Sequence, residues 1–384
     1  MNGVHVLRAA RRSCILHLTL AALASVLALT RDATPARADD EKERAYFYKD
    51  LPYGSQTLFN PIYLIVNRGY DAFQLRGDKA FGQIKSSDVE NVWENFSSPF
   101  RPISRDQPHG WSTFLTREIF PLSFGQHTAR WVPNYTLHLL GGGQSFAAMR
   151  EWFIAREAPP ILASFASAAA LYAAAFVNES IENKGVVHGF NTDCIADLWV
   201  FDLGGIVLFS FESVRRFLSE TVTISDWSLQ PAITYPHGDL HNVGSYYSLK
   251  VPLPFQDRVK LFAYGGYETL GGLSVKLHRE YSLSAAGGVR ISTYENAGGT
   301  KVVDTYILLR PAGGIFLDRN ESLLASLRAS NITDYTVSLN VYPNAFFQTS
   351  PGLGGWTAIG TDGKWIAGVS FTGAFGVGFG LGTR

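Results

Sequence analysis

One histidine and several carboxylates lie in an unusually apolar part of the chain, within residues 130–210. Spacings of three or four residues place pairs of them on one face of a helix, one turn apart. A carboxylate in apolar surroundings is costly unless it is paired, hydrogen-bonded, bound to a metal or protonated. These residues are therefore the strongest candidates for chemistry in the sequence. The candidates are His138, Glu179, Glu182, Asp193 and Asp197, with Asn134 and Asp202 beside them.

Two interpretations of this group remain open. If the helices converge, the residues form a carboxylate-rich pocket with one imidazole, which can bind a divalent metal. Such a pocket can also use His138 as a general base that a carboxylate orients. The alternative, which the sequence favours, is a hydrogen-bonded network that fixes the helices against each other. Geometry separates the two, because a functional site requires His138 and at least two carboxylates around one accessible cavity.

Composition limits the classes of function. Lys plus Arg and Asp plus Glu both number 33, so no net field favours a nucleic acid partner. Charged residues make up 17% of the chain, whereas aromatic residues reach 13% and glycine numbers 37. An average soluble chain has roughly 25% charged residues. This composition fits a β-rich protein with much of its surface against lipid. The sequence has no G-x-S-x-G motif, which excludes a serine-hydrolase nucleophile elbow.

The first 38 residues have the pattern of a secretory signal. A basic stretch around Arg11 is followed by an apolar segment, Cys14 to Leu29, and by Ala36-Arg37-Ala38, a small-residue cleavage site. We expect cleavage near Ala38. Cys194 is then the only cysteine left, so no internal disulfide is expected in the exported protein.

In the remaining chain, the pattern of apolar and polar residues changes at about residue 222. Residues 39–222 are expected to form a helical domain that contains the polar cluster. A helix capped by Asn60, with Pro61 at its first position, is predicted near the start. The segment Ile161 to Val177 is almost wholly apolar and close to the shortest length that crosses a bilayer, about 17 residues. Beside an exported β-rich half, we interpret it as a buried helix.

Residues 223–384 have the alternating pattern of antiparallel strands. Short segments such as 259–264, 273–278 and 335–341 alternate apolar and polar residues and are bounded by turn residues. About eight to ten strands fit into this length. An exported chain with such strands is typical of an outer-membrane protein. We therefore predict an α+β protein, with a helical N-terminal domain followed by an antiparallel β-barrel of outer-membrane type. The alternative for residues 223–384 is a periplasmic β-sandwich or an open sheet.

Four spaced motifs in residues 130–210 resemble those of a known family. Its members are uncharacterised Gram-negative envelope proteins, grouped as a domain of unknown function. One departure is Asn178 before Glu179, where the family usually has tryptophan. The resemblance implies a location in the envelope more than an activity. The motifs are Asn134-x-x-x-His138-x-x-Gly141, Glu179-x-x-Glu182, Asp193-x-x-x-Asp197 and Asp202-x-Gly204-Gly205.

Two functions follow as hypotheses, and the sequence leaves open whether the protein is an enzyme. The first is an outer-membrane protein with a structural, assembly or transport role. It would contact outer-membrane lipid, and a periplasmic protein could bind its helices. The second is an envelope hydrolase that acts on lipid or lipopolysaccharide through His138 and the carboxylates. A divalent metal is the cofactor that this second hypothesis allows.

Overall fold

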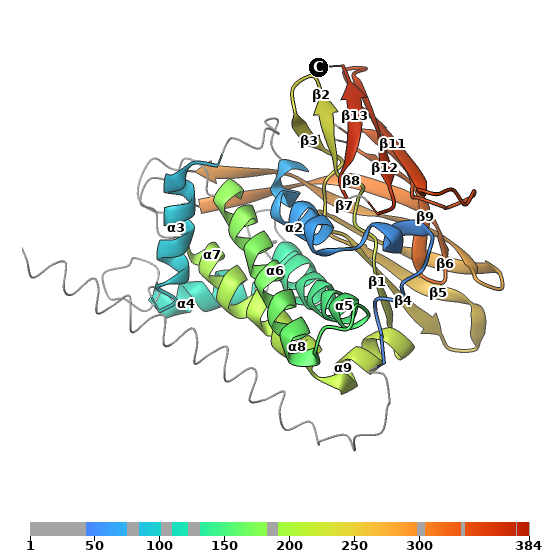
Figure 1. The fold of residues 1–384 in the computed structure, drawn as a ribbon. Helices are drawn as coiled ribbons and strands as arrows, with labels where there is room; N and C mark the ends of the chain where they lie inside the picture. Colours follow the sequence, from blue (N-terminus) through green and yellow to red (C-terminus); the bar gives the residue numbers. More distant parts are fainter. Residues whose placement is uncertain are drawn as a thin grey trace, which may run out of the picture.

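The computed structural model describes residues 44–74, 84–100, 110–121, 131–182, 191–297, 304–331, 335–373 and 375–383. The predicted signal sequence lies outside these residues. Helices come first along the chain and strands follow (Figure 1). The helices are η1 (Gly54–Leu58), α2 (Pro61–Gly69), η2 (Asp71–Gln74), α3 (Ser86–Phe96), α4 (Gly110–Phe114), η5 (Leu115–Ile119), η6 (Val132–Gly142), α5 (Gly143–Ile154), α6 (Pro160–Glu182), α7 (Thr192–Ala196), η7 (Asp197–Asp202), α8 (Leu203–Ser210), α9 (Glu212–Arg216) and η8 (Phe217–Thr221). The strands are β1 (Thr223–Asp226), β2 (Ala232–Tyr235), β3 (Asp239–His241), β4 (Tyr247–Leu253), β5 (Gln256–Gly265), β6 (Glu268–His278), β7 (Tyr281–Ala297), β8 (Asp304–Arg319), β9 (Ser322–Ser330), β10 (Val337–Val341), β11 (Leu353–Ile359), β12 (Trp365–Phe371) and β13 (Gly378–Gly382).

The strands form one sheet that is not closed, so the prediction of a β-barrel with eight to ten strands is wrong. Thirteen strands follow the order β1-β4-β5-β6-β7-β8-β9-β10-β11-β12-β13-β2-β3. From β4 to β13 each strand pairs antiparallel with the next along the chain. The early strand β2 then pairs parallel with β13 and antiparallel with β3. Within the described residues, β1 and β3 are therefore the two edges, and closure would require them to pair.

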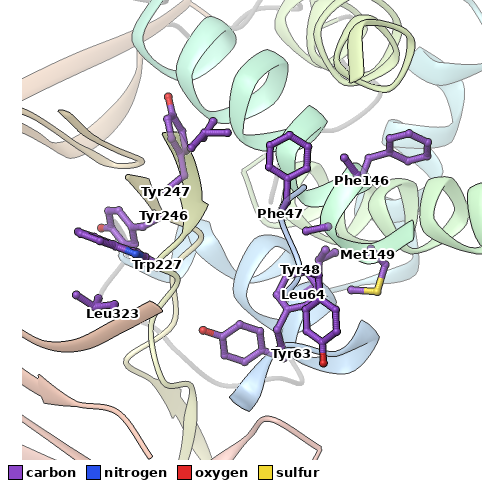
Figure 2. Packing of buried hydrophobic residues seen from close by; sticks show 14 of the residues in the cluster. Phe47, Tyr48, Tyr63, Leu64, Phe146, Met149, Trp227, Tyr246, Tyr247 and Leu323 are labelled. Atoms are coloured by element: carbon purple, nitrogen blue, oxygen red, sulfur yellow. The ribbon is translucent and has the colours of Figure 1, made fainter. Parts of the chain in front are cut away.

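The helices share their hydrophobic core with the sheet, so the predicted helical N-terminal domain is not present as a separate unit. One cluster of buried side chains includes Phe146 and Met149 of α5, Phe209 of α8, and Trp227 beside the sheet. Figure 2 shows this packing, with Tyr246 and Tyr247 at the sheet and Phe47 between the helices. Removing either part would expose the apolar surface of the other.

One local prediction about the helices is confirmed, and a second is confirmed only in part. The Asn60 side chain accepts hydrogen bonds from the backbone N–H groups of Ile62 and Tyr63, and Pro61 begins α2. The apolar segment Ile161 to Val177 lies within α6. It is only partly buried, because its first turns expose apolar side chains while its last turns carry buried Glu179.

The outer face of the sheet is apolar, whereas its inner face buries both polar side chains and large apolar ones such as Phe262 and Phe316. On the inner face, several serines, two arginines and an asparagine of β6 to β12 are buried. On the outer face, large aliphatic and aromatic side chains alternate with them and are 40% to 67% exposed. Such an outer face is unusual for a sheet in water, because antiparallel sheets commonly turn a polar face to the solvent. The outer apolar face consists of Leu261, Leu273, Val275, Leu283, Ile315, Leu327, Val337, Leu339, Leu353, Ile359, Val369, Phe379 and Leu381.

Glycine allows α8 to approach η6 and α5 closely. A Cβ atom on Gly205 would lie 2.7 Å from the Leu139 carbonyl oxygen and 2.9 Å from the Gly143 nitrogen. We expect Gly205→Ala to lower the free energy of unfolding by about 1–3 kcal/mol, because both contacts are backbone atoms. Gly204→Ala is the matched control, since its Cβ would meet only the Leu139 side chain, at 3.2 Å. Urea unfolding measures both, and equal losses would contradict the prediction.

Candidate functional site

Three of the predicted residues meet at one point among the helices. His138 comes from η6, Glu179 from α6, and Asp197 is the first residue of η7. One ligand atom from each lies within 4.8 Å of the other two. Glu179 and Asp197 are buried and His138 is nearly so. One imidazole nitrogen and two carboxylate oxygens at this separation are donors that suit a divalent metal.

Two of these residues lie in π-helical turns. Both η6, over 11 residues, and η7, over 6 residues, have π-helical hydrogen bonding. π-helical turns are rare and occur frequently at functional sites, because the wider turn changes the direction of side chains within a helix. The α7–η7–α8 helix contains such a turn from Asp197 to Asp202, and both of these carboxylates face His138.

A second layer of contacts orients the imidazole. The His138 Nδ1 atom lies 3.2 Å from Asp202 Oδ1, which also accepts a hydrogen bond from Arg68 Nη2 at 2.9 Å. Arg68 Nη1 donates to the Leu137 carbonyl oxygen at 3.1 Å. The other imidazole nitrogen, Nε2, lies 3.7 Å from Asp197 Oδ2. In many metal sites, one nitrogen of a histidine is hydrogen-bonded to a carboxylate while the other nitrogen binds the metal.

The carboxylates of the site differ in electrostatic environment. Burial, followed by the charges of neighbouring carboxylates, raises the pKa values of Glu179 and Asp197 well above their ordinary range. Burial also acts on Asp202, but the nearby His138 and Arg68 charges and hydrogen bonds outweigh it and hold the Asp202 pKa below its usual value. Asp202 is thus an anion at neutral pH. A bound cation would favour the ionised forms of Glu179 and Asp197.

The site opens into a cavity that contains two more of the predicted residues. His138, Asp197, Glu182 and Asp193 all line it, and its empty space, including the part open to solvent, is about 450 Å³. The Tyr267 hydroxyl, from the β5–β6 turn, donates to Glu182 Oε1 at 2.9 Å. The cavity therefore satisfies the geometric requirement for a functional site set above. It also shows that sheet and helices both contribute to the site.

The side chains of Asp197 and Asp202 each have one carboxylate oxygen that accepts no hydrogen bond from the described residues. In the part of the chain that the structure describes, Asp197 Oδ1 and Asp202 Oδ2 are buried without a hydrogen-bond partner. A network that serves only to lock helices together would satisfy these atoms, because an unsatisfied buried acceptor costs about 1–3 kcal/mol. Asn134 Nδ2 donates to the Glu118 carbonyl oxygen at 3.0 Å, and its Oδ1 is likewise buried without a partner among the described residues.

Sequence reasoning missed Arg68 and Tyr267. Both lie far from the motif region in the sequence, and each supports a predicted residue, Asp202 and Glu182 respectively. A weak signal existed for Arg68, because it is a cation near the end of the otherwise apolar α2. Nothing in the sequence around Tyr267 indicates its role.

Stability should depend on pH through Asp197. Because its folded-state pKa is raised, the protonated acid is favoured in the folded protein. Stability is then full below the unfolded pKa, about 3.9, and falls as pH rises towards the folded pKa. We expect metal-free Asp197→Asn protein to lose less stability than wild type between pH 4 and pH 8. Urea unfolding in EDTA at several pH values measures this, and parallel pH profiles would contradict it.

Comparisons with known proteins do not assign this chain to a family. No family model, curated protein or solved structure matches this chain. The resemblance of the four motifs to an envelope family therefore stays a prediction. Among the described helices, α6 is long and apolar enough to cross a membrane, and the bent pair Thr192–Ser210 and Glu212–Thr221 qualifies only if it counts as one span. A core helix can have the same properties.

Proposed function

We propose that this protein is a metal-dependent hydrolase whose centre is formed by His138, Glu179 and Asp197. The observation that carries the proposal is the orientation of His138. Its Nδ1 is engaged by Asp202 at 3.2 Å, its Nε2 lies 3.7 Å from Asp197 Oδ2, and one of its two ring nitrogens lies within 4.8 Å of a Glu179 oxygen. A histidine held in this way has one nitrogen left to donate to a cation. Mixed imidazole and carboxylate donors favour Zn²⁺ or Mn²⁺.

The cavity supplies the other parts that hydrolysis needs. A divalent metal lowers the pKa of a bound water, so that hydroxide is available near neutral pH. Glu182 and Asp193 line the same cavity and can accept the proton that this water loses. That proton then passes to the leaving alcohol of an ester. The two residues are thus proposed as general bases, and His138, Glu179 and Asp197 as ligands.

We further propose that the enzyme works at a lipid surface, in the outer membrane. The outer apolar face of the sheet supports this, because its thirteen large side chains are 40% or more exposed and extend from β5 to β13. Monomeric soluble proteins rarely expose contiguous apolar patches larger than a few hundred Å². Acyl chains of lipid fit a surface without charge or hydrogen-bonding groups. A lipid ester is then the substrate class.

Metal binding tests the first proposal directly. Protein stripped with EDTA and dialysed is titrated with ZnCl₂ or MnCl₂ by calorimetry. We expect one ion per chain, and little or no binding by His138→Ala. The matched control is His237→Ala, because His237 is exposed in the β2–β3 turn, far from the site in sequence. Absence of binding by the wild type, or equal binding by His138→Ala, would refute the metal centre.

Liposome flotation tests the lipid surface. Leu327 and Leu339 are directly opposite on β9 and β10, and both point outward. We expect wild type to float with phospholipid vesicles and the double variant Leu327→Asp/Leu339→Asp to float much less, because charge is costly in hydrocarbon. Gln348→Asp/Thr361→Asp adds the same charge to exposed loop positions and serves as the control. Equal flotation of the two double variants would count against the proposal.

A further inference from the structure

A second cavity lies on the inner face of the sheet, next to the one described above. Arg290 of β7 and Arg328 of β9 line it, and its empty space, including the part open to solvent, is about 340 Å³. The short helix η2 lies between the two cavities, because Asp71 lines the first and Gln74 lines the second.

The two arginines share a single carboxylate. Arg290 Nη1 donates to Glu268 Oε1 at 2.6 Å, and Arg328 Nη1 donates to Glu268 Oε2 at 3.2 Å. Their side chains are only 3% and 5% exposed. Two guanidinium groups thus contact one carboxylate, so one positive charge has no ion-pair partner in direct contact among the described side chains. The buried Asp71 is linked to Arg290 only through the Gln74 side chain. An unpaired charge of this kind is costly inside a protein unless another anion balances it.

Both arginines also keep a hydrogen-bond donor unused. Among the described residues, Arg290 Nε and Arg328 Nε are buried without a hydrogen-bond partner. The remaining neighbours are neutral. Arg290 Nη2 donates to Gln74 Oε1 at 3.3 Å, and the Arg328 guanidinium lies over the Tyr246 ring, 5.1 Å from its centroid. The charge and the unused donors therefore point to the same missing partner, an oxyanion.

Half of the other residues that line the cavity are apolar. Leu229, Leu240, Val243 and Phe73 line the cavity together with the polar residues Gln74, Asn242, Tyr335 and Ser338. A free inorganic ion would gain nothing from the apolar side chains, whereas an organic anion would bury its apolar part against them. Guanidinium groups recognise carboxylate and phosphate oxygens through paired, charge-assisted hydrogen bonds.

We propose that this cavity binds the carboxylate or phosphate group of a small, partly apolar organic anion, through Arg290 and Arg328. The site is independent of the metal centre, because none of its charged residues belongs to that centre. An acid of this kind is also what hydrolysis of an ester releases. The two sites can therefore be tested separately.

Thermal unfolding with two probes tests the proposal. Wild-type protein in EDTA is titrated with sodium benzoate or sodium phosphate at constant ionic strength, adjusted with NaCl, so that metal binding does not contribute. We expect the midpoint of unfolding to rise and saturate with benzoate, since a ligand that binds the folded state stabilises it. Saturation with phosphate alone would also support the site and assign its ligand to phosphate compounds. A wild type that shows no saturable rise with either probe would overturn the proposal.

Variants locate the effect. Arg328→Gln and Arg290→Lys are each expected to weaken the saturable response at least tenfold in probe concentration. Arg319→Gln is the matched control, because Arg319 is paired with Glu280 at 2.7 Å on the surface. If either cavity variant fails to fold, the other still tests the site, and the wild-type titration needs no variant. Responses of both cavity variants equal to that of wild type would refute the assignment.

Discussion

Replacing Asp202 with asparagine is expected to weaken binding of Zn²⁺ or Mn²⁺ by about 10- to 100-fold, although Asp202 itself is not among the proposed ligands. The residue is fully buried and its Oδ1 contacts both His138 Nδ1 and Arg68 Nη2. Asparagine keeps the shape but removes the charge. The imidazole then becomes a weaker donor, and its orientation is less firmly held.

Competition with a chromophoric chelator measures the change in metal affinity, and circular dichroism reports whether the variant is folded. Tyr267→Phe is a useful control inside the same cavity. It removes the hydrogen bond to Glu182, at 2.9 Å, but leaves the three proposed ligands and Asp202 in place. We expect Tyr267→Phe to bind metal like the wild type. A folded Asp202→Asn protein with unchanged affinity would show that Asp202 does not position His138.

The candidate site was largely predictable because helical spacing is a local property. Pairs such as Glu179 and Glu182, or Asp193 and Asp197, lie on one helix face whatever the tertiary fold. The apolar sequence around them made their polarity conspicuous. Which carboxylates would face His138 was not predictable, since the π-helical turn of η7 directs Asp197 and Asp202 to the same imidazole. The spacing of an ordinary α-helix would not place residues five apart on one face.

The strands were predictable but their assembly was not. Alternation of apolar and polar residues marks a strand and its two faces, and β6, β9 and β10 follow this pattern. The pattern does not say which strands pair over long distances. The segment between β1 and β4 crosses to the other end of the sheet. There β2 pairs in parallel with β13, which lies about 145 residues later in the chain. This return of an early strand places β2 and β3, instead of β1, beside the last strand.

The hydrophobic core that the helices share with the sheet could not be predicted from the sequence either. The residue pattern changes from helical to strand-like near residue 222, and this change indicated two domains. Trp227, however, packs against Phe262 and Phe316 of the sheet and belongs to the same buried cluster as Phe209 of α8. Contacts between residues so distant in sequence depend on the complete fold.

Replacing Lys250 with methionine is expected to lower the free energy of unfolding by about 3–5 kcal/mol, because it leaves the buried Asp318 carboxylate without its cation. Lys250 Nζ lies 2.7 Å from both Asp318 Oδ1 and Glu321 Oε2, and its side chain is 1% exposed. It also lies over the Trp227 ring, 5.3 Å from the centroid. Methionine retains the length of the side chain, so the loss reports mainly the charge.

Urea unfolding of two further variants separates charge from packing in this cluster. Lys250→Met combined with Asp318→Asn and Glu321→Gln removes all three charges, and we expect it to recover most of the lost stability, since neutral side chains are cheaper to bury than unpaired ions. Lys364→Met is the control, because Lys364 pairs with Asp362 at 3.1 Å but is 56% exposed. A single Lys250→Met loss no larger than that of Lys364→Met would mean that water reaches the carboxylates. The inner face of the sheet would then be wet, and the uncompensated charge of Arg290 and Arg328 would no longer require an organic anion.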